Sequence, residues 1–231
     1  MKIGLLGGTF NPVHRCHLSL AAEVRDRLRL DRILFIPTGN PPHKPAGSLA
    51  PAHHRVAMVR LAIGSEPSFL LSEVETQRPS TSYSIETVRI LRAQHGPDAE
   101  LFFIVGLDAF REFPTWKDAE ELLTLTHFVA VPRAGHTFRS LAALPLLPSV
   151  DPARLSELDE RREARLEVPL SPRTRLILLA VPPCDVSASD IRNALRDRRP
   201  LPKLMLPAPV ESYIMRHRLY QEGSDRTGVQ G

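Results

Sequence analysis

Cysteine is scarce, since Cys16 and Cys184 are the only two in a chain of 231 residues. Two cysteines cannot supply the several cross-links that staple a small extracellular domain together. We therefore expect no disulfide framework, and the reducing cytoplasm is the compartment that this composition favours.

Long apolar runs are also lacking. No stretch reaches the roughly 18 residues that a membrane-spanning helix needs, so we expect no membrane partner. The apolar run at residues 2–6 is too short for the hydrophobic part of a secretory signal, and it leads directly into two glycines. We therefore expect no signal peptide.

A large excess of one charge is absent too, because the formal net charge is only +4. This small positive excess suits an anionic ligand. The arginines are spread over the expected helices and form no single stripe, so we expect solvated helix faces and no nucleic-acid partner. The contents of 42% hydrophobic and 24% charged residues are those of an ordinary folded domain.

Short apolar runs alternate with helical patterns along the chain. Continuous apolar strands separated by helices are typical of an α/β fold with a doubly wound parallel sheet, here followed by a helical C-terminal part. The expected strands are residues 2–6, 33–37, 69–72, 101–105, 128–131 and 175–180. The expected helices are residues 17–29, 51–63, 82–94, 117–123, 189–197 and 208–219.

Residues 1–222 are expected to form one domain. Prolines punctuate residues 134–172 around a short charged helix near 153–166, and we treat this segment as an insertion within the domain. Residues 223–231 are expected to form a disordered tail.

The first expected strand runs into Gly7, Gly8 and Thr9, and His14 and His17 follow at the start of a helix. Adjacent glycines allow a sharp turn and the close approach of a ligand. The free N–H groups and the positive dipole end of a helix start suit phosphate. The same two histidines are compatible with a solvated helix or with half of a zinc site, for which His43 or Cys16 could be proposed as further ligands.

Two later stretches also follow the ends of expected strands. Prolines stiffen the loop that presents His43 and Lys44, which suits a phosphate, although a plain connector has the same composition. Gly106 follows the expected strand at residues 101–105 and allows the close approach of a ligand there. The Asp108 carboxylate can accept a hydrogen bond from a ribose hydroxyl or join the ligands of a magnesium ion.

A second phosphate-binding pattern lies near residue 190. Ser187 and Ser189 stand at a helix start, and Arg192 follows one turn inside. Hydroxyls and free amides meet phosphate oxygens, and arginine clamps them bidentately. A capped helix with a surface arginine has the same pattern. By the same capping preference, Thr81 or Ser82 is expected to cap the helix near residue 82.

Two sets of ionisable residues are expected at the surface. His53, His54 and Arg55 begin an amphipathic helix, and we interpret them as its solvated start. Glu73 and Glu75 alternate at the end of a strand, and we interpret both as surface residues and not as a metal pair.

The string GGTFNPVHRCH at residues 7–17 resembles the signature of nucleotidyltransferases that adenylylate small phosphates, whose usual form is GGTF, Asp, Pro and then His-x-Gly-His. Five further motifs follow in the order typical of bacterial nicotinate-nucleotide adenylyltransferases. They are PPHK, TSYS, GLD with Trp116, an arginine after a strand, and VSASDIR. The resemblance covers the chain except the insertion and the tail. Asn11 stands where that family usually has Asp, and Cys16 stands where it usually has Gly.

The resemblance implies a Rossmann-like nucleotidyltransferase fold and transfer of the adenylyl group of ATP to nicotinate mononucleotide in NAD biosynthesis. Mg²⁺ would accompany ATP through its phosphates, with Asp108 as a candidate protein ligand. The implied catalytic residues are His14, His17, Lys44 and Arg192. The implied ATP-binding residues are Gly7, Gly8, Thr9, Phe10, Cys16, Gly106, Asp108, Ser187, Ser189 and Arg192. The implied residues for nicotinate mononucleotide are Thr9, His43, Lys44, Ser84, Trp116, Lys117 and Arg133.

Two alternatives remain open at this point. One is a transferase of the same fold that acts on phosphopantetheine or glycerol phosphate, against which the Ser84 and Trp116 stretches argue. The other is a nucleotide-binding protein with weak catalysis, because the Cys16 side chain crowds the site. The sequence pattern defines no oligomeric state.

Overall fold

The strands of the protein form one sheet, seen in a computed structural model that describes residues 1–41, 48–133, 135–182, 184–201 and 205–221. They are β1 Lys2–Gly8, β2 Arg32–Pro37, β3 Phe69–Leu71, β4 Glu100–Gly106, β5 His127–Val131, β6 Arg165–Pro169 and β7 Arg175–Leu179. Their order in the sheet is β3-β2-β1-β4-β5-β7-β6. All neighbours pair in parallel except β6, which runs antiparallel to β7. The predicted doubly wound sheet is confirmed.

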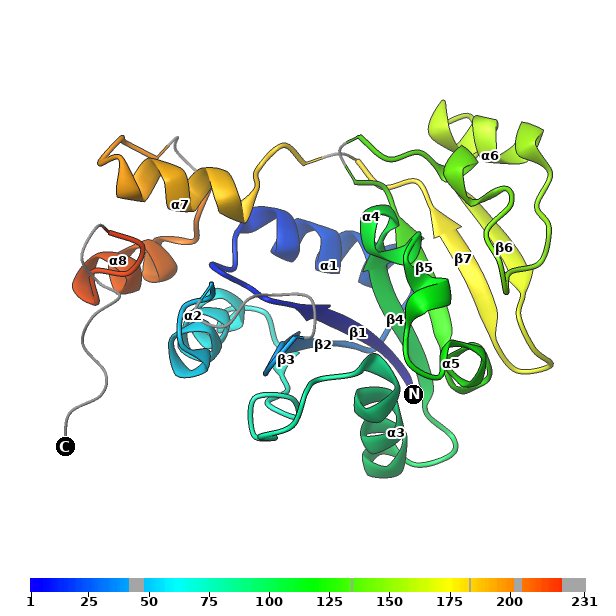
Figure 1. Ribbon diagram of the computed structural model, residues 1–231, viewed down its shortest axis with the longest axis horizontal. Helices are drawn as coiled ribbons and strands as arrows, with labels where there is room; N and C mark the ends of the chain where they lie inside the picture. The colour runs from blue at the N-terminus through cyan, green and yellow to red at the C-terminus, as the bar shows by residue number, and fades with distance from the viewer. Residues whose placement is uncertain (42–47, 134, 183, 202–204, 222–231) are drawn as a thin grey trace.

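Helices cover both faces of this sheet (Figure 1). The α-helices are α1 Arg15–Leu28, α2 Ala52–Ile63, α3 Ser84–His95, α4 Leu107–Phe110, α5 Ala119–Leu125, α6 Pro152–Asp159, α7 Ala188–Arg196 and α8 Ala208–Arg216. Two short 3₁₀ segments, η1 Phe113–Thr115 and η2 Phe138–Leu141, join them. Among the described residues, no helix is both long enough and apolar enough to cross a bilayer.

The alternation of side chains along β1 divides the core into two layers. Ile3 and Leu5 belong to a cluster that also contains buried residues of α3, α5 and α6. Leu6 belongs to a second cluster, on the other face, with buried residues of α1, α2, α7 and α8. Because successive residues of a strand point to opposite faces, an apolar run such as IGLLG can be buried on both sides.

The chain reverses its direction of winding between β1 and β4. From β1 it proceeds to β2 and β3 on one side of the sheet, and then it crosses to β4 on the other side of β1. Ligands of open α/β sheets bind beyond the carboxyl ends of the strands at such a switch point. Gly7, Gly8 and Gly106 lie at these ends.

The insertion differs from its expected structure. The charged helix expected near 153–166 ends at Asp159, and residues 165–169 form the edge strand β6. Leu166 and Val168 of this strand are buried, whereas Arg165 is exposed and Glu167 is half-buried. This period of two distinguishes a strand from a helix, but it spans only one short run between prolines.

The start of α3 also differs from the expectation. The helix begins at Ser84, Tyr83 is its N-cap, and no side chain caps it, so the prediction of a Thr81 or Ser82 cap is wrong. The predicted roles of His43 and Lys44, and the predicted tail at residues 223–231, lie outside the described residues.

Candidate active site

The carboxyl end of β1 borders open space. Gly7 is exposed although β1 lies inside the sheet, and a Cβ atom added to it would meet no atom of the described residues within 4 Å. Gly106, at the end of the neighbouring β4, is more tightly held, because a Cβ there would lie 2.5 Å from Oδ1 of Asp108. The two glycines therefore leave room for a ligand at the switch point and for the Asp108 side chain beside it.

The first turn of α1 is organised by its two histidines. His14 is the N-cap, and its backbone N–H donates to Nδ1 of His17, 3.2 Å away. The two rings lie 3.8 Å apart between centroids, and Phe10 meets His17 edge-on at 5.0 Å. Phe10 is only 1% exposed, so its side chain belongs to the core, and its assignment to the ATP site stays a prediction. Its ring supports His17 from the core.

Both imidazoles are neutral at pH 7. Burial, with a smaller contribution from the charge of Arg133, lowers the pKa of His14 to about 4. Burial also holds the pKa of His17 well below its usual value, with smaller contributions from His14 and Arg133. His17 nevertheless keeps part of its surface accessible to solvent. An anion bound there would raise both pKa values.

Arg133 supplies positive charge next to these histidines. Its Nε lies 3.6 Å from Oδ2 of Asp108, and both side chains are about half exposed. The structure thus brings His14, His17, Asp108 and Arg133 together, as their assignment to one site requires. The imidazole Nδ1 of His14 is buried and has no hydrogen-bond partner within the described part of the chain.

The second predicted phosphate-binding pattern joins the first. Ser187 is the N-cap of α7, as predicted, and its hydroxyl accepts the N–H of Asp190 at 3.1 Å. Arg192 donates to Oγ of Ser189 at 3.1 Å and to the backbone carbonyl of Asn11 at 2.8 Å. Because Asn11 lies between β1 and α1, the two helix starts are parts of one surface.

Asn11 also anchors two other segments. Its side-chain oxygen accepts the backbone N–H of Ala50 at 3.0 Å and the hydroxyl of Tyr220 at 2.9 Å. Asn11 is 2% exposed. The family that the sequence resembles usually has Asp at this position. Asn11 therefore preserves a hydrogen-bond acceptor there without burying a charge.

Arg55 is a structural support that the sequence interpretation missed. It was expected at a solvated helix start, but it is only 2% exposed. Its guanidinium donates to the carbonyl oxygens of Thr9 and Ala50, each at 2.9 Å. Thr9 is thereby held by its backbone beside the glycines. Burial lowers the pKa of Arg55.

Glu75 was also expected at the surface and is buried, with 7% exposure. Its Oε1 accepts the hydroxyl of Thr87 at 2.8 Å, and burial raises the pKa of its carboxyl group. A Cβ atom on Gly39 would lie 2.3 Å from the Glu75 carbonyl oxygen and 2.9 Å from Oγ of Ser82. The loop after β2 is thus packed directly against this buried group.

The residues predicted to bind the pyridine ring lie around the start of α3. Ser84 is its first residue, and the ammonium group of Lys117 lies 4.6 Å from the ring centroid of Tyr83. Lys117 also donates to Oε1 of Glu86 at 2.9 Å, which raises its pKa. Trp116 is half-buried and packs against Phe103 and Phe113. One edge of this region is therefore aromatic and one is cationic.

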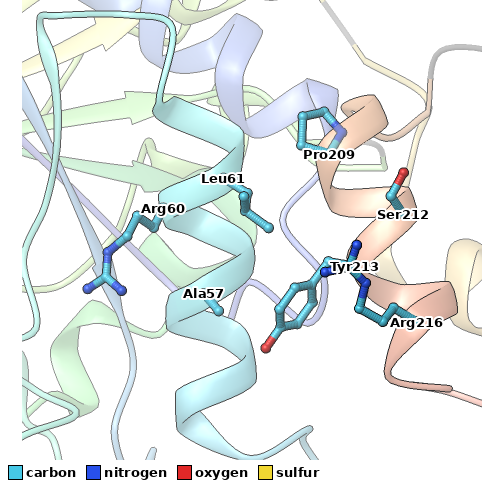
Figure 2. A pocket seen from close by; sticks show the side chains of 7 residues that line it. All are labelled: Ala57, Arg60, Leu61, Pro209, Ser212, Tyr213 and Arg216. Carbon is cyan, nitrogen blue, oxygen red and sulfur yellow. The ribbon is translucent and has the colours of Figure 1, made fainter.

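Two surface hollows lie outside the switch point. One of about 440 Å³ lies between α2 and α8 and contains none of the predicted site residues (Figure 2). The other, of about 480 Å³, borders Trp116 and is lined by Asp118, Glu120 and Glu121. Three carboxylates make this second hollow a poor site for an anion.

Cys16 and Cys184 form a disulfide bond, with their Cα atoms 5.7 Å apart. The sequence led us to expect no disulfide framework, and the structure contains one bond that this expectation did not include. Their sequence separation of 168 hides a proximity that the sheet creates, because α1 follows β1 and Cys184 lies between β7 and α7. Cys16 is the second residue of α1 and is 7% exposed, whereas Cys184 is exposed.

The lowered pKa of His14 predicts a pH-dependent stability. Between pH 6.5 and pH 4 the unfolded chain binds a proton at this residue and the folded chain does not. The stability that neutral His14 contributes to the folded protein is therefore fully present above pH 6.5, and it is lost as the pH falls toward 4. From pH 7 to pH 4.5 we expect His14 to account for a loss of about 2 kcal/mol.

Urea unfolding at both pH values tests this expectation. His14→Asn retains a residue suited to an N-cap but does not titrate, so it should lose about 2 kcal/mol less stability than the unchanged protein over this interval. Equal losses in the two proteins would mean that folded His14 takes up a proton as readily as the unfolded chain does.

The chain is similar to known proteins over nearly its whole length. Residues 5–194 match the cytidylyltransferase-like family model. The chain is 42% identical to a probable nicotinate-nucleotide adenylyltransferase from Pelobacter propionicus, over 96% of this chain and 99% of that protein. It is also 42% identical to one so described from Symbiobacterium thermophilum, over 96% of each chain.

A solved structure has the same fold. It is Plasmodium falciparum nicotinic acid mononucleotide adenylyltransferase complexed with NaAD, with a TM-score of 0.68, 18% sequence identity, and coverage of 95% of this chain and 97% of that chain. On the strength of the sequence relatives, which are matched over nearly their whole length, the chain belongs to the nicotinate-nucleotide adenylyltransferase family of nucleotidyltransferases.

Proposed function

We propose that the protein transfers the adenylyl group of ATP to nicotinate mononucleotide, which yields nicotinate adenine dinucleotide and pyrophosphate. The hydrogen bond from Arg192 to the carbonyl of Asn11 is the observation that carries this proposal most directly. It makes one continuous surface of two helix starts, each suited to phosphate. A triphosphate has enough phosphate groups to occupy both.

The reaction requires no protein nucleophile. A phosphate oxygen of nicotinate mononucleotide forms a bond to the α-phosphorus of ATP. The bond from that phosphorus to the bridging oxygen breaks, and its electron pair leaves with pyrophosphate. The protein therefore acts by positioning the two substrates and by stabilising negative charge on the phosphoryl oxygens.

The residues of the α1 start take the central role in this proposal. His14 and His17, which are neutral without a ligand, donate ring N–H groups to the triphosphate, whose charge favours their protonated forms. Arg133 and Arg192 add permanent positive charge from two other segments. Thr9, held through its carbonyl by Arg55, keeps the glycine turn in place.

Mg²⁺ fits this site as an ion that arrives with the triphosphate. No group of three or more potential side-chain ligands occurs within the described ranges, and Asp108 is the carboxylate nearest the open end of β4 that we assign to it. Bound Mg²⁺ would neutralise part of the phosphate charge. The proposal places the reaction in the cytoplasm, where ATP and a reducing thiol pool coexist.

Release of pyrophosphate, measured over a panel of acceptors, tests the proposal. The purified full-length chain should release pyrophosphate from MgATP when nicotinate mononucleotide is added. Phosphopantetheine and glycerol phosphate, the acceptors of other transferases of this fold, should give no release above background. Turnover with either of these in preference to nicotinate mononucleotide would overturn the proposed acceptor.

A further inference from the structure

The Cys16–Cys184 pair lies between the two phosphate-binding patterns of the proposed site. Cys16 directly precedes His17 in the first turn of α1, and Cys184 lies three residues before Ser187, the N-cap of α7. The bond therefore clamps the connection between β7 and α7 onto the helix start at which we place the triphosphate.

The clamp leaves no room for a nucleoside between the two segments. A planar base held between two surfaces needs roughly 7 Å, twice the 3.5 Å contact distance of carbon atoms. The Cα atoms of Cys16 and Cys184 are only 5.7 Å apart. With the bond closed, this gap is filled by the cysteine side chains themselves.

A second contact also joins α1 to the start of this connection. Arg27, near the far end of α1, donates to the carbonyl oxygen of Ala180 at 2.9 Å, just after β7. Reduction therefore releases the Cys184 end of the connection while Ala180 remains attached. The movement that follows is local and lies next to Ser187 and Ser189.

We propose that Cys16 and Cys184 form a reversible redox site that closes the ATP site at the starts of α1 and α7 when oxidised and opens it when reduced. This inference rests on the proposed placement of ATP at the start of α1. Its chemical partner is a small thiol–disulfide couple. Overall, the protein disulfide and two thiols give two protein thiols and one small disulfide.

The two sulfurs differ in ways that set the order of events. A small thiolate attacks Sγ of Cys184, because Cys184 is exposed and Cys16 is 7% exposed. Cys16 leaves as a thiolate, which the positive end of the α1 dipole stabilises before it takes a proton from solvent. A second small thiolate then attacks the small-molecule sulfur of the mixed disulfide on Cys184. The small disulfide is released and Cys184 leaves as a thiolate, which also takes a proton from solvent.

Calorimetry with MgATP tests the proposal on the full chain in both states. One sample is reduced with dithiothreitol and desalted without oxygen, the other is treated with oxidised glutathione, and titration of free thiols verifies each state. We expect the reduced protein to bind ATP about tenfold more tightly, which is within the usual range of coupling between two sites. Equal affinity in the two states, or tighter binding by the oxidised protein, would overturn the switch.

The thermodynamic linkage between ATP binding and reduction of the cysteine pair supplies a measurement that does not depend on turnover. If reduction strengthens ATP binding tenfold, ATP must favour reduction by the same factor, which corresponds to a shift of about 30 mV in the potential of the cysteine pair. The shift is measured in glutathione buffers with and without MgATP. A potential that ATP does not change would contradict the proposal.

Cys184→Ser is the matched variant, because Cys184 has no assigned part in binding or catalysis. It should bind ATP as the reduced protein does and should not respond to oxidised glutathione. If the variant still lost ATP affinity under oxidant, the effect would come from elsewhere and the proposal would fail. If neither state of the unchanged protein bound ATP, the placement of the ATP site would be wrong and the switch with it.

Discussion

His17→Ala should lower kcat by about 10²–10³, the effect typical of removing one donor that stabilises transition-state charge. His17 lies in the first turn of α1, next to His14 and within reach of the charge of Arg133. Steady-state pyrophosphate release at saturating MgATP and nicotinate mononucleotide measures the change.

The variant should still be folded. The substitution removes the acceptor of the His14 N–H and the edge contact with Phe10, which together contribute about 1–2 kcal/mol. Such a loss is smaller than the stability of a typical domain. Far-ultraviolet circular dichroism and urea unfolding check this. His53→Ala is the matched control, because His53 is exposed on α2 and should retain full activity.

His17→Gln separates the chemical role of the imidazole from its structural one. A glutamine at the third position of a helix can accept the N–H of the N-cap residue, as His17 Nδ1 does here. If His17 only braced the helix start, His17→Gln would recover most of the rate. We expect it to recover stability and to remain about as slow as His17→Ala. A fast glutamine variant would refute the catalytic assignment.

The elements of the fold could be predicted where local periodicity is strong. The apolar runs of β1, β2 and β4 are each buried on both faces, so composition alone indicates a central parallel strand. β6 escaped prediction because its alternation spans only two buried residues, Leu166 and Val168. An edge strand of this length depends on its partner β7 more than on its own sequence.

The site could be predicted in part, since its glycines and helix starts have local signatures. Arg55 and Glu75 could not, because their burial depends on acceptors and donors from other segments: Thr9 and Ala50 for Arg55, and Thr87 for Glu75. A charged residue at a helix start has the same local pattern whether it is solvated or buried. Tertiary contacts alone distinguish the two cases.

The Cys16–Cys184 bond could not be predicted for a related reason. Sequence spacing contains no information on the proximity of residues 168 positions apart. The proximity appears only once β7 is placed two strands away from β4 and its following loop returns over α1. A count of two cysteines excludes a multiply cross-linked scaffold, but it does not exclude a single bond.

The protein should prefer nicotinate mononucleotide to the corresponding nicotinamide nucleotide by a factor on the order of 10 to 1,000. The two differ by a carboxylate in place of a neutral amide. A hydrogen bond to a charged group contributes about 1.5–3 kcal/mol, so one or two such bonds give a preference of this size. The measurement is kcat/KM for each nucleotide at saturating MgATP.

The surroundings of α3 are the reason for this expectation. Ser84 offers a hydroxyl at the positive end of the α3 dipole, and the Lys117 ammonium lies beside Tyr83. Glu86 works against them, because its carboxylate already pairs with Lys117. The hollow that borders Trp116 is lined by three carboxylates and not by Ser84, so we place the pyridine carboxylate beside Ser84.

Two substitutions test which residues produce the preference for the acid over the amide. Ser84→Ala should lower the ratio of acid to amide about tenfold, since one hydrogen bond to the carboxylate is lost. Glu86→Gln should raise the ratio, because it frees Lys117 from its ion pair and removes a negative charge near the pocket. Ser140→Ala, at an exposed serine of η2, is the matched control and should leave the ratio unchanged. A ratio near one in the unchanged protein would mean that the pyridine pocket is misassigned, even if adenylyl transfer itself is observed.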